Sequence, residues 1–234
     1  MRKHWVILTA LVAIASALLT VVFFTVPLVP VAASQQAKPV DSLLKVMFSI
    51  GGAIFALVVI VLLYSVVVFR CRPGDTSDGP PLEGHKALET MWTLVPLAIV
   101  ISLATWGGIE LRDMLRPPAE MELVVKVDSF QWGWRFEYPQ YGFSSPMLAL
   151  PADRPVLFRL TSRDVIHSFW IPEFRLKQDS VPGRETYLRI TPTRPGDYGL
   201  RCAELCGRAH WAMQAQVKVV DADAFQRWAE GMRR

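Results

Sequence analysis

The sequence predicts a membrane-anchored all-β protein, in which apolar helices precede a domain built from short strands. Three long apolar runs occupy the first half of the chain, at 6–24, 43–69 and 90–108. From Met121 onward the pattern changes to short alternating or β-branched runs, separated by proline and glycine turns. A hydrophobic content of 52% agrees with a chain that lies partly in lipid.

The second and third apolar runs each reach the roughly 20 residues that a helix needs to span a bilayer. The loop between them carries Arg70, Arg72 and Lys86, and basic residues beside membrane ends favour the cytoplasmic side. These runs therefore predict a transmembrane helical hairpin over 43–108 that enters and leaves from the outer face. Residues 109–234 then form an outer domain.

The first run leaves two alternatives open for residues 1–33. A basic start and small residues at Val31-Ala32-Ala33-Ser34 resemble a secretory signal peptide and its cleavage site. However, about 19 apolar residues exceed the usual 7–15 of a signal core, which favours a retained N-terminal transmembrane helix. Both alternatives leave Ser34 outside, so the topology downstream is the same.

Six short runs of the outer domain predict strands, at 122–127, 131–138, 155–161, 186–191, 198–203 and 213–220. Several short strands at regular spacing indicate an all-β sandwich or barrel. A helix is expected over 221–232, because Asp221 can cap it and Phe225 and Trp228 fall on one face. The sequence has no nucleic-acid motif, and its net charge of +4 is modest.

Metal-binding side chains are concentrated near the end of the outer domain, in a segment that reads C-x-E-x-C-x-x-x-H-x-x-M from Cys202 to Met213. A further histidine, His167, lies upstream. Thiolates, imidazoles and a thioether select copper or zinc over magnesium or calcium. A single-copper electron-transfer site takes two His, one Cys and a weak axial Met. Because two sulfurs can each bridge two metals, the additional Cys suits a dinuclear copper centre.

Two other interpretations of the cysteines stay open at this point. Two Cys on the outer face of a membrane can form a disulfide, although a spacing of four residues permits this only in a tight turn. A C-x-x-x-C segment with a His can also bind zinc, but zinc sites rarely use Met. The presence of the whole set beside membrane segments favours copper.

From Leu43 to Val220 the chain resembles subunit 2 of haem–copper cytochrome c oxidases. Five segments carry the resemblance: Glu89-Thr90-Met91-Trp92-Thr93, Gln131-Trp132-Gly133-Trp134, Asp164–Trp170, Lys177–Arg184 and the C-x-E-x-C-x-x-x-H-x-x-M segment. The resemblance implies that the outer domain is a cupredoxin-like Greek-key β-barrel with the dinuclear copper centre called CuA.

The resemblance also implies a role for each metal-binding residue. The thiolates of Cys202 and Cys206 would bridge both coppers. The His167 imidazole and the Met213 thioether would complete one copper. The His210 imidazole and the Glu204 backbone carbonyl would complete the second. The Glu204 side chain would face subunit 1 and hold a magnesium ion there. Asp164 and Asp179 would belong to the surrounding polar networks.

Two further residues receive roles from the resemblance. Trp132 would be the residue through which electrons enter, and Glu89 would lie at the inner mouth of a proton path into subunit 1. A carboxylate at a helix end is also a simple interfacial anchor, so this second interpretation of Glu89 stays open. The chain departs from the commonest pattern at Gly133, where many relatives have an aromatic residue, which makes the surface around Trp132 less aromatic.

The function implied is that of subunit 2 of a cytochrome c oxidase, a multi-pass protein of a bacterial plasma membrane with its CuA domain on the periplasmic or extracellular face. Electrons would pass from cytochrome c or a small copper protein to CuA, and then to haem in subunit 1. There O₂ is reduced to water with proton translocation, so the chain alone is not a complete catalyst. The alternatives are a copper-binding membrane protein without a redox partner and a quinol-oxidase-like subunit without CuA.

Overall fold

A computed structural model describes residues 2–71, 73–74, 79, 81, 83–117 and 121–233. Arg72 of the basic inner loop therefore lies outside the described residues. The chain divides into two compact units. One comprises Met1–Leu28 with Ser42–Leu111, and the other comprises Val29–Asp41 with Arg112–Arg234.

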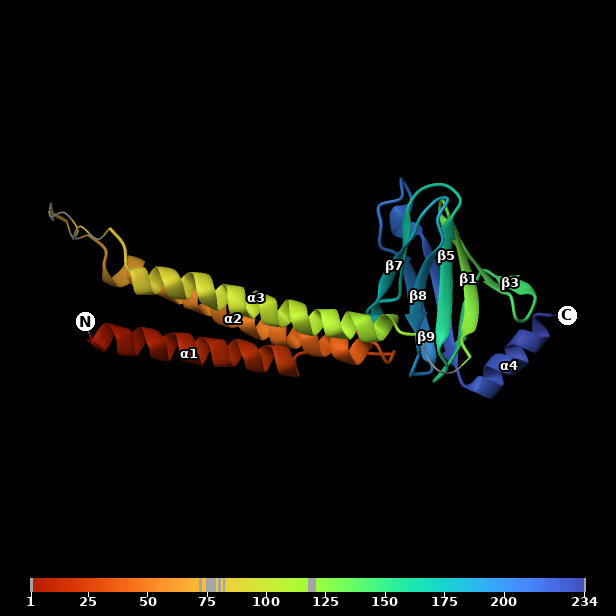
Figure 1. Ribbon diagram of the computed structural model, residues 1–234, viewed down its shortest axis with the longest axis horizontal. Helices are drawn as coiled ribbons and strands as arrows, with labels where there is room; N and C mark the ends of the chain where they lie inside the picture. The colour runs from red at the N-terminus through yellow and green to blue at the C-terminus, as the bar shows by residue number, and fades with distance from the viewer. Residues whose placement is uncertain are drawn as a thin grey trace. The chain divides into compact units, whose positions relative to one another are not determined.

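The three predicted apolar runs form long helices (Figure 1), which are α1 (Arg2–Thr25), α2 (Ala37–Val68) and α3 (Lys86–Leu115). Each is long and apolar enough to cross a membrane. Most of their large apolar side chains are exposed, as expected of surfaces that lie in lipid rather than water. The membrane-anchored part of the predicted fold class is therefore confirmed.

The outer unit is a β-sandwich of two five-stranded sheets (Figure 1). The first sheet has the order β3-β2-β1-β5-β8, with strands β1 (Leu123–Phe130), β2 (Gly133–Tyr138), β3 (Phe143–Ser145), β5 (Val156–Ser162) and β8 (Thr186–Ile190). The second has the order β4-β10-β9-β6-β7, with strands β4 (Leu148–Pro151), β6 (His167–Trp170), β7 (Lys177–Ser180), β9 (Gly196–Cys202) and β10 (Gln214–Val220). Short 3₁₀ turns cover Pro172–Phe174 and His210–Ala212.

Alternation along the strands builds the core between the two sheets. In β1 every second side chain is buried, and in β5 the same pattern buries Val156, Phe158 and Leu160. Phe158 packs against Phe169 of the opposite sheet with ring centroids 4.8 Å apart. These residues define one face of each strand because successive side chains of a strand point to opposite sides of the sheet.

The predicted C-terminal helix is present as α4 (Ala222–Gly231). The Asp221 carboxylate accepts a hydrogen bond from the Ala224 N–H at 2.8 Å, which satisfies one of the free amides of the first turn. Trp228 packs on the ring of Tyr138 with centroids 5.4 Å apart, and Phe225 is buried. The helix is therefore held by the apolar face that its sequence predicts.

The segment Val29–Asp41, which precedes the bulk of α2, is an integral part of the outer unit. Ala33 is fully buried, its N–H donates to the Glu173 carbonyl at 2.9 Å and its carbonyl accepts from the Thr193 N–H at 2.9 Å. Arg175 fixes the same segment: its guanidinium donates to both carboxylate oxygens of Asp41 and to the Pro30 carbonyl. We call Val29–Asp41 the strap.

Candidate metal centre

Five of the six predicted metal-binding residues lie in Cys202–Met213, which runs from the last residue of β9 to the residue before β10 and which we call the metal-binding loop. Its two ends are adjacent because β9 and β10 pair in antiparallel register, with Arg201 opposite Gln214. His167, the sixth residue, opens β6, which pairs with β9 so that Phe169 lies opposite Cys202. A hydrogen bond of 2.9 Å from the Ala203 N–H to the Ser168 carbonyl extends this pairing into the loop. Sheet register therefore brings His167 to the loop.

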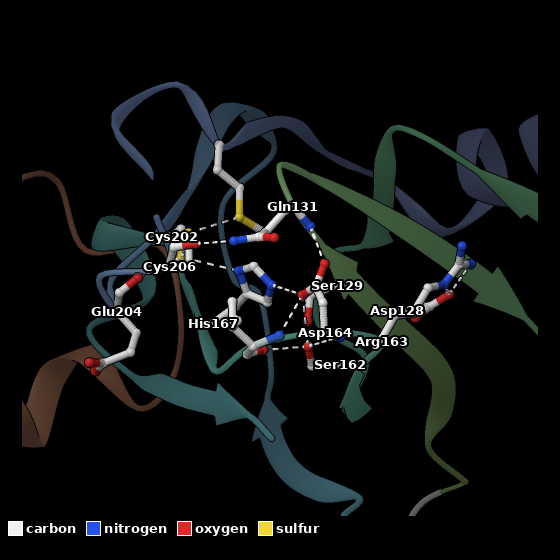
Figure 2. A network of polar contacts seen from close by, with 12 residues as sticks. Asp128, Ser129, Gln131, Ser162, Arg163, Asp164, His167, Cys202, Glu204 and Cys206 are labelled. Carbon is white, nitrogen blue, oxygen red and sulfur yellow. Dashed lines mark hydrogen bonds and ion pairs between the residues drawn. The ribbon is translucent and has the colours of Figure 1, made fainter. Parts of the chain in front are cut away.

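The sulfur atoms and ring nitrogens of these residues lie close together, and Figure 2 shows His167, Cys202 and Cys206 among them. Cys202 Sγ and Cys206 Sγ lie 3.7 Å apart, and both cysteines are free thiols. Nδ1 of His167 lies 3.9 Å from Cys202 Sγ, and Nδ1 of His210 lies 3.6 Å from Cys206 Sγ. The Met213 Sδ atom is 3.7 Å from Cys206 Sγ. Two thiols therefore stand between two imidazoles, with a thioether beside one of them.

Glu204 contributes its backbone rather than its side chain to this cluster. The Glu204 carbonyl oxygen lies 3.2 Å from Cys202 Sγ. Its side chain is exposed, and Figure 2 shows the carboxylate directed away from the two cysteines. The carbonyl and the carboxylate of this residue therefore point to different surroundings.

A carboxylate fixes the orientation of the His167 ring. Asp164 Oδ1 lies 2.8 Å from His167 Nε2, so Nε2 is engaged and Nδ1 faces the sulfur. Burial alone would raise the pKa of Asp164, but hydrogen bonds from the Gln131 N–H, the His167 ring and the Val165 N–H lower this pKa to about 2. The side chain is therefore an ionised acceptor, a common partner of a metal-binding imidazole.

Burial controls the ionisation of the Cys206 thiol. Cys202, Cys206, Met213 and His167 are all buried. Burial raises the pKa of the Cys206 thiol to about 11, and the neighbouring Cys202 adds to the shift. Without a metal the Cys206 sulfur is thus protonated at neutral pH, and a soft cation that displaces the proton gains a thiolate in a dry, preformed pocket.

The donor set fits copper better than the alternatives. Three of the donors, in His167, Cys202 and Cys206, lie within 4.8 Å of one another. A Met sulfur in contact with a Cys sulfur is typical of copper sites and rare in zinc sites. The residues present therefore fit a copper centre.

Trp132 lies in the turn between β1 and β2, beside the metal-binding loop. The Trp132 side chain is 40% exposed. A Cβ atom added to Gly207, the residue after Cys206, would lie 3.3 Å from Trp132 Cζ2. Trp134, by contrast, is buried and packs edge-on to His167 with centroids 6.2 Å apart. Trp132 is therefore exposed beside the metal-binding loop, whereas Trp134 is buried against His167.

The departure at Gly133 has a steric basis. A Cβ atom at this position would lie 2.9 Å from Cε2 of Phe130, so the Phe130 ring occupies the space that a larger residue at 133 would need. The Arg163 guanidinium lies over the Phe130 ring, with its central carbon 5.1 Å from the ring centroid. Arg163 also forms an ion pair with Asp128. An aromatic ring is therefore still present at Gly133, supplied by Phe130 of β1.

Glu89 and Asp179 make contacts that belong to a helix start and to a strand pair. Glu89 belongs to the first turn of α3, where its Oε1 accepts the His85 N–H at 2.9 Å, while His85 Nδ1 accepts the Leu88 N–H at 3.3 Å. This reciprocal arrangement caps the helix. Asp179 lies in β7 opposite Ser168, and its backbone carbonyl accepts the Thr186 hydroxyl. Helix capping by Glu89 was not predicted from the sequence.

The fold and the donor set define a membrane-anchored, cupredoxin-like copper protein. The model of the cytochrome c oxidase subunit II periplasmic domain matches residues 144–220, and the model of the subunit II transmembrane domain matches residues 21–107. The chain belongs to the cytochrome c oxidase subunit 2 family. It is therefore a subunit of a haem–copper oxidase complex, an oxidoreductase, and its family implies copper.

Two relatives identified by sequence agree with this assignment. The chain is 35% identical to cytochrome c oxidase subunit 2 of Synechocystis over 86% of its own length and 74% of the relative. It is also 35% identical to cytochrome c oxidase subunit 2 of Thermostichus vulcanus, over 86% of its length and 77% of the relative. Among solved structures, the periplasmic domain of subunit II of the Bradyrhizobium japonicum cytochrome oxidase is similar to 49% of the chain and is covered over 95% of its own length, with 27% identity and a TM-score of 0.47.

Proposed function

We propose that the outer domain is the electron-accepting CuA domain of a cytochrome c oxidase. The observation that carries the proposal is the pair of buried thiols 3.7 Å apart, each faced by Nδ1 of a histidine. Dinuclear copper held there would supply one-electron transfer between a donor and haem in subunit 1. Four such electrons and four protons reduce one O₂ to two waters, coupled to proton translocation.

Each donor has a role that its position supports. The Cys202 and Cys206 thiolates would bridge the two coppers. His167 and Met213 would complete one copper, and His210 with the Glu204 carbonyl would complete the other. The burial of Met213 beside Cys206 supports a role for its thioether as a weak ligand that would tune the redox potential.

The exposed Glu204 carboxylate supports a second metal site at the contact with subunit 1. A carboxylate is a hard oxygen ligand, which suits magnesium and not the soft copper centre. Since its own carbonyl lies 3.2 Å from Cys202 Sγ, Glu204 would connect the two metals through one residue. Substitution of Glu204 by Gln should lower the magnesium or manganese content of the purified oxidase and leave the copper content unchanged.

The donor would be cytochrome c or a small copper protein, with electrons entering through Trp132. Exposed apolar side chains on the segments that carry the ligands support docking by apolar contact; besides Trp132 they are Val165, Ile166, Leu205 and Trp211, the last two each 80% exposed. Aromatic anchors of this kind dominate the binding energy of many interfaces. The sequence has no C-x-x-C-H haem attachment motif, in agreement with a separate donor protein.

The domain plan and location follow from the same proposal. Residues 1–33 would be a signal peptide or N-terminal transmembrane helix, residues 43–108 a transmembrane hairpin, and residues 109–234 the CuA domain. The membrane would be a bacterial plasma membrane, with the outer domain in the periplasm or at the cell surface. Glu89, at the start of α3, would lie at the inner mouth of a proton path into subunit 1.

Purified chain, reconstituted with copper, tests the proposal directly. We expect two coppers per chain and the purple, mixed-valence spectrum with a delocalised electron-resonance signal. A single copper with a one-copper hyperfine pattern would contradict the dinuclear assignment. Copper without reduction by any cytochrome c or small copper protein would instead favour a copper-binding protein with no redox partner.

A further inference from the structure

One residue of the β1–β2 turn contacts both segments that carry the metal-binding side chains. The Gln131 side-chain amide Nε2 donates to the Cys206 carbonyl at 2.8 Å. The Gln131 backbone N–H donates to Asp164 Oδ2 at 2.7 Å. Figure 2 shows the two bonds leaving Gln131 in different directions, one toward the cysteines and one toward Asp164.

The second of these bonds continues to a metal-binding histidine. Asp164 accepts Gln131 with Oδ2 and contacts His167 Nε2 with Oδ1, at 2.8 Å. The Val165 N–H also donates to Oδ1 at 2.7 Å, which restricts rotation of the carboxylate. Gln131 is therefore linked to Cys206 directly and to His167 through one rigid carboxylate.

The backbone of the metal-binding loop is shaped to approach Gln131 closely. Gly207 has φ +123, a conformation that side chains disfavour, and an added Cβ would lie 2.9 Å from Gln131 Nε2. The same Cβ would lie 3.3 Å from Trp132 Cζ2. Glycine at position 207 lets the loop contact both residues of the turn, so this contact depends on the residue type at that position.

We propose that Gln131 is a positioning residue that sets the placement of Cys206 relative to His167 and holds Trp132 against the metal-binding loop. Its amide fixes the peptide plane that follows the Cys206 thiol, and this plane determines where Sγ points. Its backbone N–H fixes the carboxylate that orients the His167 ring. The copper-dependent part of this inference rests on the proposed function, whereas the positioning itself is a property of the chain without metal.

Two substitutions separate hydrogen bonding from packing. Gln131→Met keeps the length of the side chain and removes its donor, while Gln131→Glu keeps the shape and places an acceptor against the Cys206 carbonyl. Gln216→Met is the matched control, because Gln216 is an exposed residue of β10. Circular dichroism of all three proteins establishes that each is folded.

The first measurement uses the full-length, copper-free, reduced chain in detergent. Hydrogen exchange of peptides that cover residues 202–213 should be at least about tenfold faster in Gln131→Met and Gln131→Glu than in the parent and the control, because local opening loses a buried hydrogen bond. Exchange at the parent rate in both variants would overturn the inference. This outcome does not depend on whether the site holds copper.

The second measurement uses the copper-loaded chain. We expect both Gln131 variants to show an altered copper hyperfine pattern and at least a tenfold slower reduction by the donor, with the control unchanged. A parent-like signal and rate in Gln131→Met would show that Gln131 only fills space, and would overturn the inference. Failure of the parent itself to bind two coppers would refute the proposed function and leave the exchange result as the test of positioning.

Discussion

The Cys202 N–H donates to the Met213 carbonyl at 3.1 Å, which closes the metal-binding loop at the residues where it leaves β9 and enters β10. The first and last metal-binding residues of the segment are therefore tied by the sheet itself. Rigid placement of this kind suits electron transfer, because a site that hardly moves on a redox change needs little reorganisation.

Replacement of either thiol should abolish the dinuclear centre. Cys202→Ser and Cys206→Ser each remove one of two bridging sulfurs, and a hydroxyl is a poor substitute for a thiolate at copper. Copper content and electron resonance of the purified variants are the measurements. Two coppers per chain with a delocalised mixed-valence signal in either variant would refute the assignment.

Substitution of the thioether should have a milder effect. Met213→Leu keeps a buried apolar side chain of similar volume, so the folding cost should be below about 1.5 kcal/mol. Because an axial thioether tunes the potential more than it secures the metal, the variant should retain two coppers and change its redox potential. Loss of copper, or a potential equal to that of the parent, would contradict this role.

Removal of the exposed indole should slow electron transfer from the donor. Trp132→Ala should lower the rate of reduction by roughly tenfold or more, as for loss of an interface anchor, and leave the copper spectrum intact. Tyr187→Ala is the control, since Tyr187 is an exposed aromatic residue of β8 outside the metal-binding segments. Stopped-flow reduction is the measurement, and equal rates in parent and Trp132→Ala would exclude the proposed role.

Docking of the donor should depend only weakly on salt. Residues 108–234 carry 18 basic and 16 acidic side chains, and Arg201 and Arg208, both exposed, flank the metal-binding loop. A basic donor would meet these arginines near the copper, so docking should rest mainly on apolar contact. The second-order rate should fall by less than about tenfold between roughly 0.01 and 0.3 M salt, a range over which steered encounters slow steeply.

A steep fall in that rate would instead favour an acidic docking patch from Glu110, Asp113, Glu120 and Glu122. Of these, Glu120 lies outside the described residues. Glu122 accepts a hydrogen bond from Arg189 Nε at 2.9 Å, and Asp113 lies between Arg112 and Arg116. These two carboxylates are thus partly neutralised by their neighbours.

Loss of Arg175 should destabilise the outer domain through the strap. The Arg175 side chain is almost fully buried, and Arg175→Ala leaves the Asp41 carboxylate and the Pro30 carbonyl without their donor. We expect a loss of about 2–3 kcal/mol in the free energy of unfolding, below the range for fully buried pairs because Asp41 is partly exposed. Arg163→Ala, at an exposed pair, should cost roughly 0–1 kcal/mol. Denaturant unfolding compares the two, and equal effects would contradict the structural role of Arg175.

Periodicity predicted the parts of the fold that are long or strongly alternating. All six predicted strands correspond to observed strands, and the helix at 221–232 is present because its cap and apolar face are local signals. Strands β3, β4, β6 and β7 were not predicted, since three or four residues are too short to establish an alternation. Their pairing depends on neighbours far apart in the chain.

The residue types of the candidate site could be predicted from the sequence, but the contacts that orient them could not. Spacing and ligand chemistry identified Cys202 through Met213, whereas the link from Gln131 to Cys206 spans 75 positions and has no sequence signal beyond its place beside Trp132. Likewise, nothing local indicates that Arg175 reaches Asp41, 134 positions away. Such contacts follow from sheet register, which is a property of the whole domain.

The burial of Ala33 restricts when residues 1–33 could be removed, if they are a signal peptide. A peptidase needs an extended, accessible backbone, yet the N–H and carbonyl of Ala33 are both hydrogen-bonded inside the folded outer unit. Cleavage beside Ala33 would then have to precede closure of the β-sandwich, and folded full-length chain should resist signal peptidase. Trimming and folding would thus form a one-way sequence, in which a chain that folds first keeps its N-terminal helix permanently.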